Sequence, residues 1–215
     1  MTSFDPISLT IALALLSLVP LLFVTMTAFL KIAIVLSIVR NALGVQQIPP
    51  NMAIYGLALM LTLFVMAPVG SQMADAVTRT PPTNDVRAII AEVRKAAEPL
   101  RRFLVANSKP EQRDFFHSTA NRMWPEKFSA GTTDEDFLIV TPAFLVSELT
   151  SAFQVGFLLF LPFIVIDLVI SNILMAMGMM MVSPVTISLP LKLFLFVMID
   201  GWSRLLHGLV QTYTL

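Results

Sequence analysis

The sequence contains no cysteine, only two histidines and few charged residues. Without cysteine there is no disulfide framework, no thiol nucleophile and no thiolate metal site. Charged residues make up 13% of the chain and the formal net charge is zero, so no global positive field attracts nucleic acid. Basic residues also lack the interleaving with aromatic residues that favours base stacking. We therefore expect no nucleic-acid partner.

The sequence motifs of the common enzyme classes are absent as well. There is no Gly-rich phosphate loop, no His-Glu-x-x-His pair and no nucleophile elbow. An intramembrane aspartyl protease needs two carboxylates that share a proton, and nothing near Asp167 and Asp200 builds a substrate cleft around such a pair. A thioether copper site lacks a neighbouring nitrogen ligand, because His117 and His207 are isolated. We expect no enzyme activity, no metal and no cofactor.

Apolar residues dominate what is present. They make up 56% of the chain and the mean hydropathy is +0.81, which is typical of polytopic membrane proteins. A membrane-spanning helix needs about 20 apolar residues. Four zones reach or approach that length: Ile7–Leu30, Met52–Val69, Phe137–Ile170 and Ile173–Ile199. The first zone follows MTSFDP, which has no Lys or Arg, so we expect it to be retained rather than cleaved as a signal peptide.

Four prolines interrupt the last two apolar zones: Pro142, Pro162, Pro184 and Pro190. Each proline removes a backbone donor, so we expect kinked or broken helices whose freed carbonyls find partners inside an assembly. The predicted fold class is an all-α membrane protein of kinked or broken helical hairpins with a small soluble insert. We divide it into a hydrophobic hairpin over residues 1–69, an insert over 70–136 and a second hydrophobic hairpin over 137–215.

The insert carries most of the charged residues, evenly split in sign, which indicates a soluble segment. A first helix is predicted with Thr83 or Asn84 as its cap and with Pro99 kinking or dividing it. Its apolar residues recur at helical spacing: Val86, Ile89, Ile90, Val93, Ala97, Leu100 and Leu104. A second helix is predicted from about Glu111 to Met123, with an apolar face of Phe115, Phe116 and Trp124. A helical cap or spacer explains the insert better than a ligand-binding role does.

Orientation follows from the segment between the first two apolar zones. Lys31 and Arg40 lie there with no acidic residue to offset them. The positive-inside rule places such a loop in the cytoplasm and the insert on the opposite side, which in a bacterium is the periplasm. The basic residues of the insert do not conflict with this, because long loops largely escape the rule.

Ionisable residues in the apolar second half need partners: Glu148, Asp167, Lys192 and Asp200. Three acids and one base cannot neutralise each other there, which indicates oligomerisation. We expect Glu148 to pair with Lys192, within a chain or between copies, and the alternative is that both snorkel from helix ends. For Asp167 a helix–helix hydrogen bond competes with a proton relay, and we favour the hydrogen bond.

A methionine cluster follows Asp167: Met175, Met177, Met179, Met180 and Met181. On a helix, Met177, Met180 and Met181 would share one face, which favours simple packing. Gly178 and the Ser183–Pro184 pair instead favour a loop that projects into a lumen, where flexible thioethers form a gasket. The residues alone leave packing ahead of the gasket.

Long stretches of the chain resemble the FliP/YscR (SctR) family of type III secretion and flagellar export. The matching segments are FLKIAIVLSIVRNALGVQQIPPN at Phe29–Asn51, GLALMLTLFVMAPV at Gly56–Val69, LPFIVIDLVISNILMAMGMMMVSP at Leu161–Pro184 and LPLKLFLFVMIDGW at Leu189–Trp202. The motif VQQIPPN and the short length are more similar to the injectisome branch than to the flagellar branch, whose members often carry a signal sequence.

The resemblance implies a non-enzymatic core subunit of the export gate in the bacterial inner membrane. Such subunits form a pentamer in a helical cone with a FliR/SctT-like subunit, small two-helix FliQ/SctS-like subunits and an FlhB/SctU-like switch subunit. Unfolded substrate proteins pass through its centre. The resemblance makes Met179, Met180 and Met181 the gasket that seals the closed pore, with Met175 and Met177 close by, and makes Glu148 and Lys192 a contact between copies. It also implies that the cone sits largely above the bilayer plane.

Two other function classes remain open. A small-solute or proton-coupled transporter would use Asp167 as its carrier site and should show internal repeats, which the sequence lacks. A membrane scaffold without a conducting role would explain the packing but would leave exposed methionines without a purpose.

Overall fold

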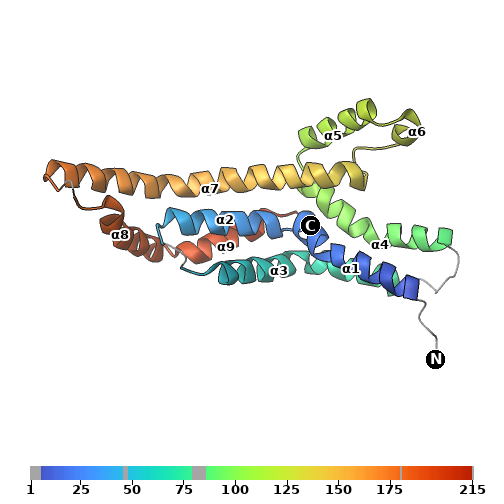
Figure 1. Ribbon diagram of the computed structural model, residues 1–215, viewed down its shortest axis with the longest axis horizontal. Coiled ribbons are helices and arrows are strands. Elements are labelled where there is room, and N and C mark those ends of the chain that lie inside the picture. The colour runs from blue at the N-terminus through green and yellow to red at the C-terminus, as the bar shows by residue number, and fades with distance from the viewer. Residues whose placement is uncertain (1–5, 46–47, 79–85, 180, 215) are drawn as a thin grey trace.

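A computed structural model describes residues 6–45, 48–78, 86–179 and 181–214, and within these ranges every regular element is a helix (Figure 1). The all-α prediction is confirmed. The caps expected at Thr83 and Asn84 lie outside the described residues, as does Met180.

The first hydrophobic half contains α1 (Pro6–Met26), α2 (Phe29–Ala42) and α3 (Asn51–Thr78). The chain bends by 63° between α1 and α2. Thr27 lies at this bend, where its hydroxyl donates to the Phe23 carbonyl at 2.6 Å and accepts the Phe29 amide at 3.4 Å. Such a bond from a threonine to the preceding turn competes with the helical ladder and bends helices.

The insert contains α4 (Val86–Asn107), α5 (Pro110–Met123) and α6 (Glu126–Ser129). Both helices predicted from its sequence are present. α5 begins at Pro110, where the missing backbone donor is harmless because the first turn has no helical acceptor for it. Pro99 does not divide α4, although the ribbon changes direction along its length (Figure 1).

The second hydrophobic half contains α7 (Phe137–Ala176), α8 (Pro184–Met198) and α9 (Gly201–Gln211). α7 has 40 residues, so it is about 60 Å long, about twice the thickness of the bilayer core. α8 and α9 meet at a bend of 62°. Asp200 stands at that bend in the left-handed region with φ 53°.

The expectation of kinked or broken helices in the second half is met at one proline, because α8 begins at Pro184 after a break in the apolar zone. The other three prolines do not break a helix, and kinks at them stay a prediction. Pro142 and Pro162 lie inside the uninterrupted α7, and Pro190 lies inside α8. Pro184 takes the first turn of α8, which suits a residue without a donor. Two further breaks fall at Thr27–Ala28 and Ile199–Asp200, where a side-chain hydrogen bond and a left-handed residue redirect the chain.

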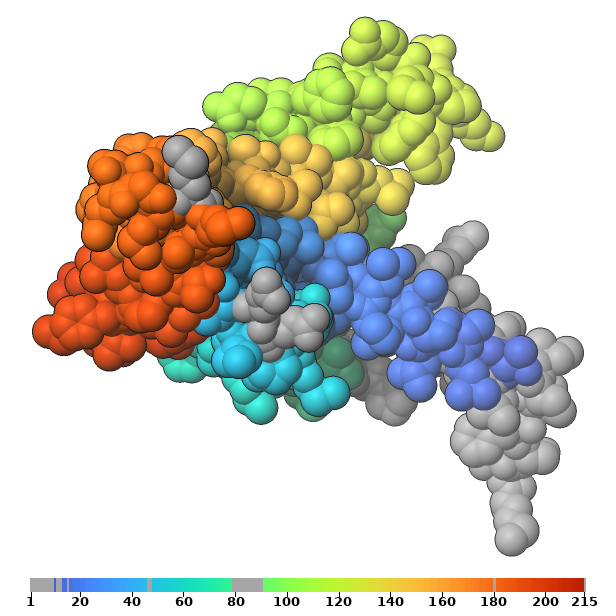
Figure 2. All heavy atoms as spheres, turned by 60° about the vertical axis from the view of Figure 1, so that its left-hand side comes forward, coloured from blue at the N-terminus to red at the C-terminus, as the bar shows by residue number. Residues whose placement is uncertain are grey.

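α2 lies between α7 and α3, and the insert packs on α7 and α3 through α5 and α4 (Figure 1). The core centres on α2, where Ile32, Val35 and Leu36 are fully buried. The α7–α8 hairpin forms the far end of the molecule, and Figure 2 shows its orange and red atoms facing the viewer with the yellow-green insert projecting above.

Much of the apolar surface has no cover within the chain. By length and composition α3 and α7 are each able to cross a membrane, and up to four spans result if each bent helix pair counts as one. Only 11% of the most hydrophobic stretch of α7 is buried inside the chain. This surface requires lipid or other subunits to cover it.

Candidate functional site

A buried ion pair joins α2 to α7. The Lys31 Nζ lies 2.8 Å from Glu148 Oε1, and the two side chains are 5% and 2% exposed. The Tyr213 hydroxyl donates to the other carboxylate oxygen of Glu148 and also lies 3.1 Å from the Ala28 carbonyl. The Lys31 ammonium sits 3.8 Å from the centre of the Tyr213 ring, which adds a cation–π contact. Both buried charges are therefore fully partnered.

The chain beyond α9 ties this cluster to the insert. The Asn107 side-chain Nδ2 donates to the Thr214 backbone carbonyl at 2.8 Å, and the Asn107 Oδ1 accepts a hydrogen bond from the Thr214 backbone N–H at 3.0 Å. The Phe103 ring of α4 stacks on Tyr213 with the ring centres 6.0 Å apart. The insert, α2, α7 and the residues after α9 thus meet around one polar cluster.

A second ion pair joins α7 to α8. The Lys192 Nζ lies 2.6 Å from Asp167 Oδ2 and 3.3 Å from the Ala42 carbonyl at the end of α2. The Ser188 hydroxyl donates to the other oxygen of Asp167. A cation at a helix C-terminus is favoured by the helix dipole, so Lys192 holds three helices together.

The expected ion pair between Glu148 and Lys192 is not formed within the chain. Each has a different partner, Lys31 for Glu148 and Asp167 for Lys192. The prediction counted bases only in the second half of the chain and assigned Lys31 to a loop. α2 is instead a buried helix that brings this second base to Glu148. A contact between copies through Glu148 and Lys192 stays a prediction.

The loop expected around Lys31 and Arg40 is also corrected, because both residues belong to α2. Arg40 bonds the start of α3 instead, with its Nη1 2.6 Å from Asn51 Oδ1 and 3.3 Å from the Pro49 carbonyl. Lys31 is an isolated cation within an apolar run, and this pattern predicts a position inside the protein. The same reasoning singled out Asp167. The role of Tyr213 had no comparable signal.

Asp200 has a local role. Its carboxylate accepts a hydrogen bond from the Ser203 hydroxyl at 3.0 Å, and its side chain is exposed. Asp167 and Asp200 therefore bind different partners and do not share a proton. Among the described residues no group of three or more His, Asp or Glu side chains could hold a metal ion.

The methionine loop lies at the tip of the α7–α8 hairpin: Met175 belongs to the last turn of α7, and Met177, Met179 and Met181 lie between α7 and α8. Gly178 adopts φ +75°, its amide bonds the Met175 carbonyl at 3.0 Å, and the Met179 amide bonds the Leu174 carbonyl at 2.9 Å. These two bonds make a Schellman motif that ends α7. The exposed fractions are 57% for Met175, 67% for Met177, 39% for Met179 and 102% for Met181. The described methionines therefore do not pack into the core of this chain.

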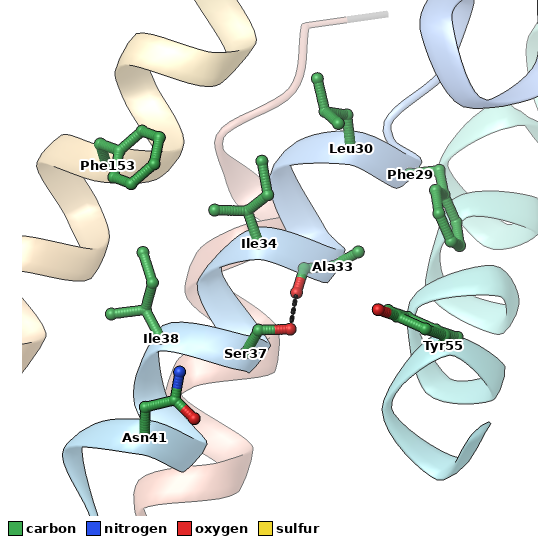
Figure 3. Close-up of a pocket in the computed structure, with 9 residues that line it drawn as sticks. All are labelled: Phe29, Leu30, Ala33, Ile34, Ser37, Ile38, Asn41, Tyr55 and Phe153. Atoms are coloured by element: carbon green, nitrogen blue, oxygen red, sulfur yellow. Dashed lines mark hydrogen bonds between the residues drawn. The ribbon is translucent and has the colours of Figure 1, made fainter. Parts of the chain in front are cut away.

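An apolar groove of about 500 Å³ opens between α2, α3 and α7 (Figure 3). Ile34 and Ile38 of α2 point toward Phe153 of α7, and Tyr55 of α3 borders the other side. The Ser37 hydroxyl bonds the Ala33 carbonyl at 2.8 Å and so is already satisfied. The groove has the character of a packing surface and not of a reaction site.

Comparison with known proteins agrees with these features. A model of the FliP family matches residues 12–209. The chain is 52% identical to the Yop proteins translocation protein R of Yersinia pestis, over 97% of each chain. It is 48% identical to the harpin secretion protein HrcR of Erwinia amylovora, over 98% of this chain and 97% of that one. It is also 48% identical to the virulence protein YscR of Salmonella typhimurium, over 98% of each chain. The chain therefore belongs to the FliP family, in its type III secretion injectisome branch.

Proposed function

We propose that this protein, a component of the type III secretion apparatus, is a pore-lining core subunit of the export gate. In this proposal a pentamer conducts unfolded substrate proteins across the bacterial inner membrane, and the methionine loops seal the closed pore. The observation that carries the proposal is the exposed methionine loop, in which Met181 is wholly uncovered within the chain.

The uncovered apolar surface supports an oligomer. Exposed large apolar side chains cover the outer faces of α7 and α8, including Phe157, Leu158, Phe194 and Val197. A lipid-facing helix needs about 30 Å of apolar length and α7 has about 60 Å. The surplus length requires a protein cover, which sister copies and FliR-like, FliQ-like and FlhB-like subunits would provide in a cone that stands largely above the bilayer plane.

Methionine side chains suit a seal that must fit many substrates. They are long, unbranched and polarizable, so a ring of them conforms to a passing polypeptide and closes behind it. A narrow hydrophobic ring also blocks ions by excluding water. The Schellman motif at Gly178 supports this role, because it holds the loop away from α7 instead of continuing the helix.

The proposed orientation places the insert in the periplasm. Arg40 remains the positive charge near the end of α2, whereas Lys31 is neutralised by Glu148 and no longer counts toward the positive-inside rule. The insert lies at the end of α7 opposite the methionine loop (Figure 1).

The decisive experiment replaces Met179, Met180 and Met181 with alanine and measures membrane ion conductance and secretion of a reporter substrate. A wider ring should raise conductance. A matched control replaces Met52, Met60 and Met123, which are 86%, 66% and 75% exposed and lie outside the loop. Unchanged conductance and unchanged secretion in the loop variant would remove the gasket role.

Native mass spectrometry of the detergent-extracted complex tests the copy number. The proposal expects a pentamer with small helical partners. A stable solitary protomer that still supports transport would favour a transporter, in which Asp167 would be the carrier site. Asp167 is already held by Lys192 and Ser188, which argues against that use. A pentamer that never conducts, even with the alanine loop, would favour a scaffold.

A further inference from the structure

A second apolar pocket, of about 290 Å³, lies where the α8–α9 bend meets α7. Its walls include Leu159, Pro162, Phe163, Leu195, Phe196 and Ile199. Leu195 is 37% exposed and Ile199 is 47% exposed, so the pocket opens to the outside of the chain.

The aromatic wall of this pocket is closely packed. The Phe196 ring lies 6.2 Å from the Phe163 ring and 5.3 Å from the Trp202 ring. A Cβ on Gly201 would lie 2.4 Å from the Phe196 ring, so the backbone of α9 presses directly against it. The pocket is thus preformed and does not need a ligand to open it.

Arg204 is the charged residue among the described pocket lining. Within the described part of the chain no carboxylate lies at ion-pair distance from Arg204 and its side chain makes no hydrogen bond. Asp200, one turn earlier, is engaged by Ser203. The Arg204 side chain is exposed at the edge of the pocket, so its guanidinium is accessible to an anionic group of a ligand.

We propose that this pocket binds an anionic membrane phospholipid, with an acyl chain among the apolar walls and the phosphate on Arg204. Arginine suits this ligand because its planar fork donates two parallel hydrogen bonds to a phosphate. Basic pockets between membrane helices are a recurrent type of acidic-lipid site. A zwitterionic phospholipid fits less well, because its own ammonium group competes with Arg204 for the phosphate.

The test uses the complete complex, purified in detergent and stripped of lipid. Phosphatidylglycerol and phosphatidylcholine with identical oleoyl chains are added separately, and bound lipid is counted by native mass spectrometry alongside the change in Tm. We expect phosphatidylglycerol to bind about fivefold more tightly, the factor that one basic side chain provides. Arg204→Gln should abolish this preference, whereas Arg122→Gln, which removes an exposed arginine of the insert, should retain it.

A second variant separates the two parts of the site. Ile199→Trp fills the pocket mouth and leaves Arg204 intact, so it should weaken both lipids. Inorganic phosphate alone should not raise Tm. Equal binding of the two lipids, or a preference that survives Arg204→Gln, would overturn the proposal. Stabilisation by phosphate alone would also overturn it. So would an Arg204→Gln variant whose subunits dissociate while lipid binding is unchanged, because Arg204 would then pair with a protein carboxylate.

Discussion

Lys31 and Glu148 lie 117 positions apart in the sequence and form an ion pair in the interior, with 2.8 Å between the ammonium nitrogen and the nearer carboxylate oxygen. A buried pair of this kind contributes specificity as much as stability, because two desolvated charges tolerate few other arrangements. It places the Lys31 face of α2 against the Glu148 face of α7.

Replacing Lys31 with methionine should destabilise the fold strongly, because the buried Glu148 carboxylate would keep only the Tyr213 hydrogen bond and lose the cation that neutralises it. We expect a loss of about 3–5 kcal/mol in the free energy of unfolding. The double variant Lys31→Met/Glu148→Leu should lose much less, since both charges are gone. Denaturant unfolding in a mild detergent measures both, with the exposed Lys127→Met as the control. Equal losses in the single and double variants would contradict the argument.

Lys192 should couple energetically to Asp167 and not to Glu148 in the isolated chain. Double-mutant cycles with Lys192→Gln, Asp167→Asn and Glu148→Gln separate the two pairs, and direct contacts give couplings of about 0.5–3 kcal/mol. The Asp167 side chain is 36% exposed, so we expect the lower part of that range. A coupling between Lys192 and Glu148 that is measured only in the assembled complex would establish the contact between copies.

Gly156 permits the close approach of α2 and α7. A Cβ at this position would lie 2.4 Å from Ile38 Cδ1 and 3.1 Å from its Cγ2, so Gly156→Ala overpacks the contact. We expect a cost of about 1–3 kcal/mol, partly relieved by a second change Ile38→Ala. Gly70→Ala is the control, because nothing lies within 4 Å of a Cβ there. Thermal unfolding should show the control unharmed, and a neutral Gly156→Ala would refute the close approach.

Gly178→Ala should misdirect the methionine loop. The φ of +75° costs a residue with a Cβ about 1–2 kcal/mol, so the loop will favour other conformations. Secretion of a reporter should fall, and Gly178→Asn should restore part of it, because asparagine tolerates the left-handed region best among the other residues. The control Gly208→Ala lies in α9 with open space around its Cβ. Equal secretion by the alanine and asparagine variants would show that loop geometry is not critical.

The insert should lose a small stabilising contribution in acid. A hydrogen bond from Arg101 holds the pKa of the Glu98 carboxyl below its ordinary value, against the opposing effect of desolvation. A carboxyl group whose pKa is lowered in the folded state stabilises the fold at pH values above its unfolded pKa of about 4.3. That contribution is lost as the pH falls through the folded-state pKa. The Tm difference between the wild type and Glu98→Gln should thus be present at pH 7, begin to shrink below about pH 4.3 and vanish once the pH is below the lowered folded-state pKa. It will be small because the pair is partly exposed, and a difference independent of pH would exclude the ionic origin.

The helices were predictable from the sequence where apolar and charged residues alternate clearly. α4 and α5 followed from apolar residues among charged ones and from the prolines that bound α5, whereas the end of α7 at Gly178 was only the second of two alternatives. The bends were not predictable in the same way. The sequence analysis placed the breaks at prolines, yet two of the bends lie at Thr27 and Asp200. A side-chain hydrogen bond directs the first bend and a left-handed backbone residue directs the second.

The sequence by itself determined the protein class, the charged insert and the residues that needed partners, whereas its residue pattern favoured packing of the methionines over a loop. Only the tertiary structure decided the partners themselves, which joined Lys31 to Glu148 and Lys192 to Asp167. α3 and α7 are apolar on every side, so their residue pattern marks no single face for packing. Which charges meet then depends on how distant helices dock against each other, and that arrangement exists only once the chain has folded.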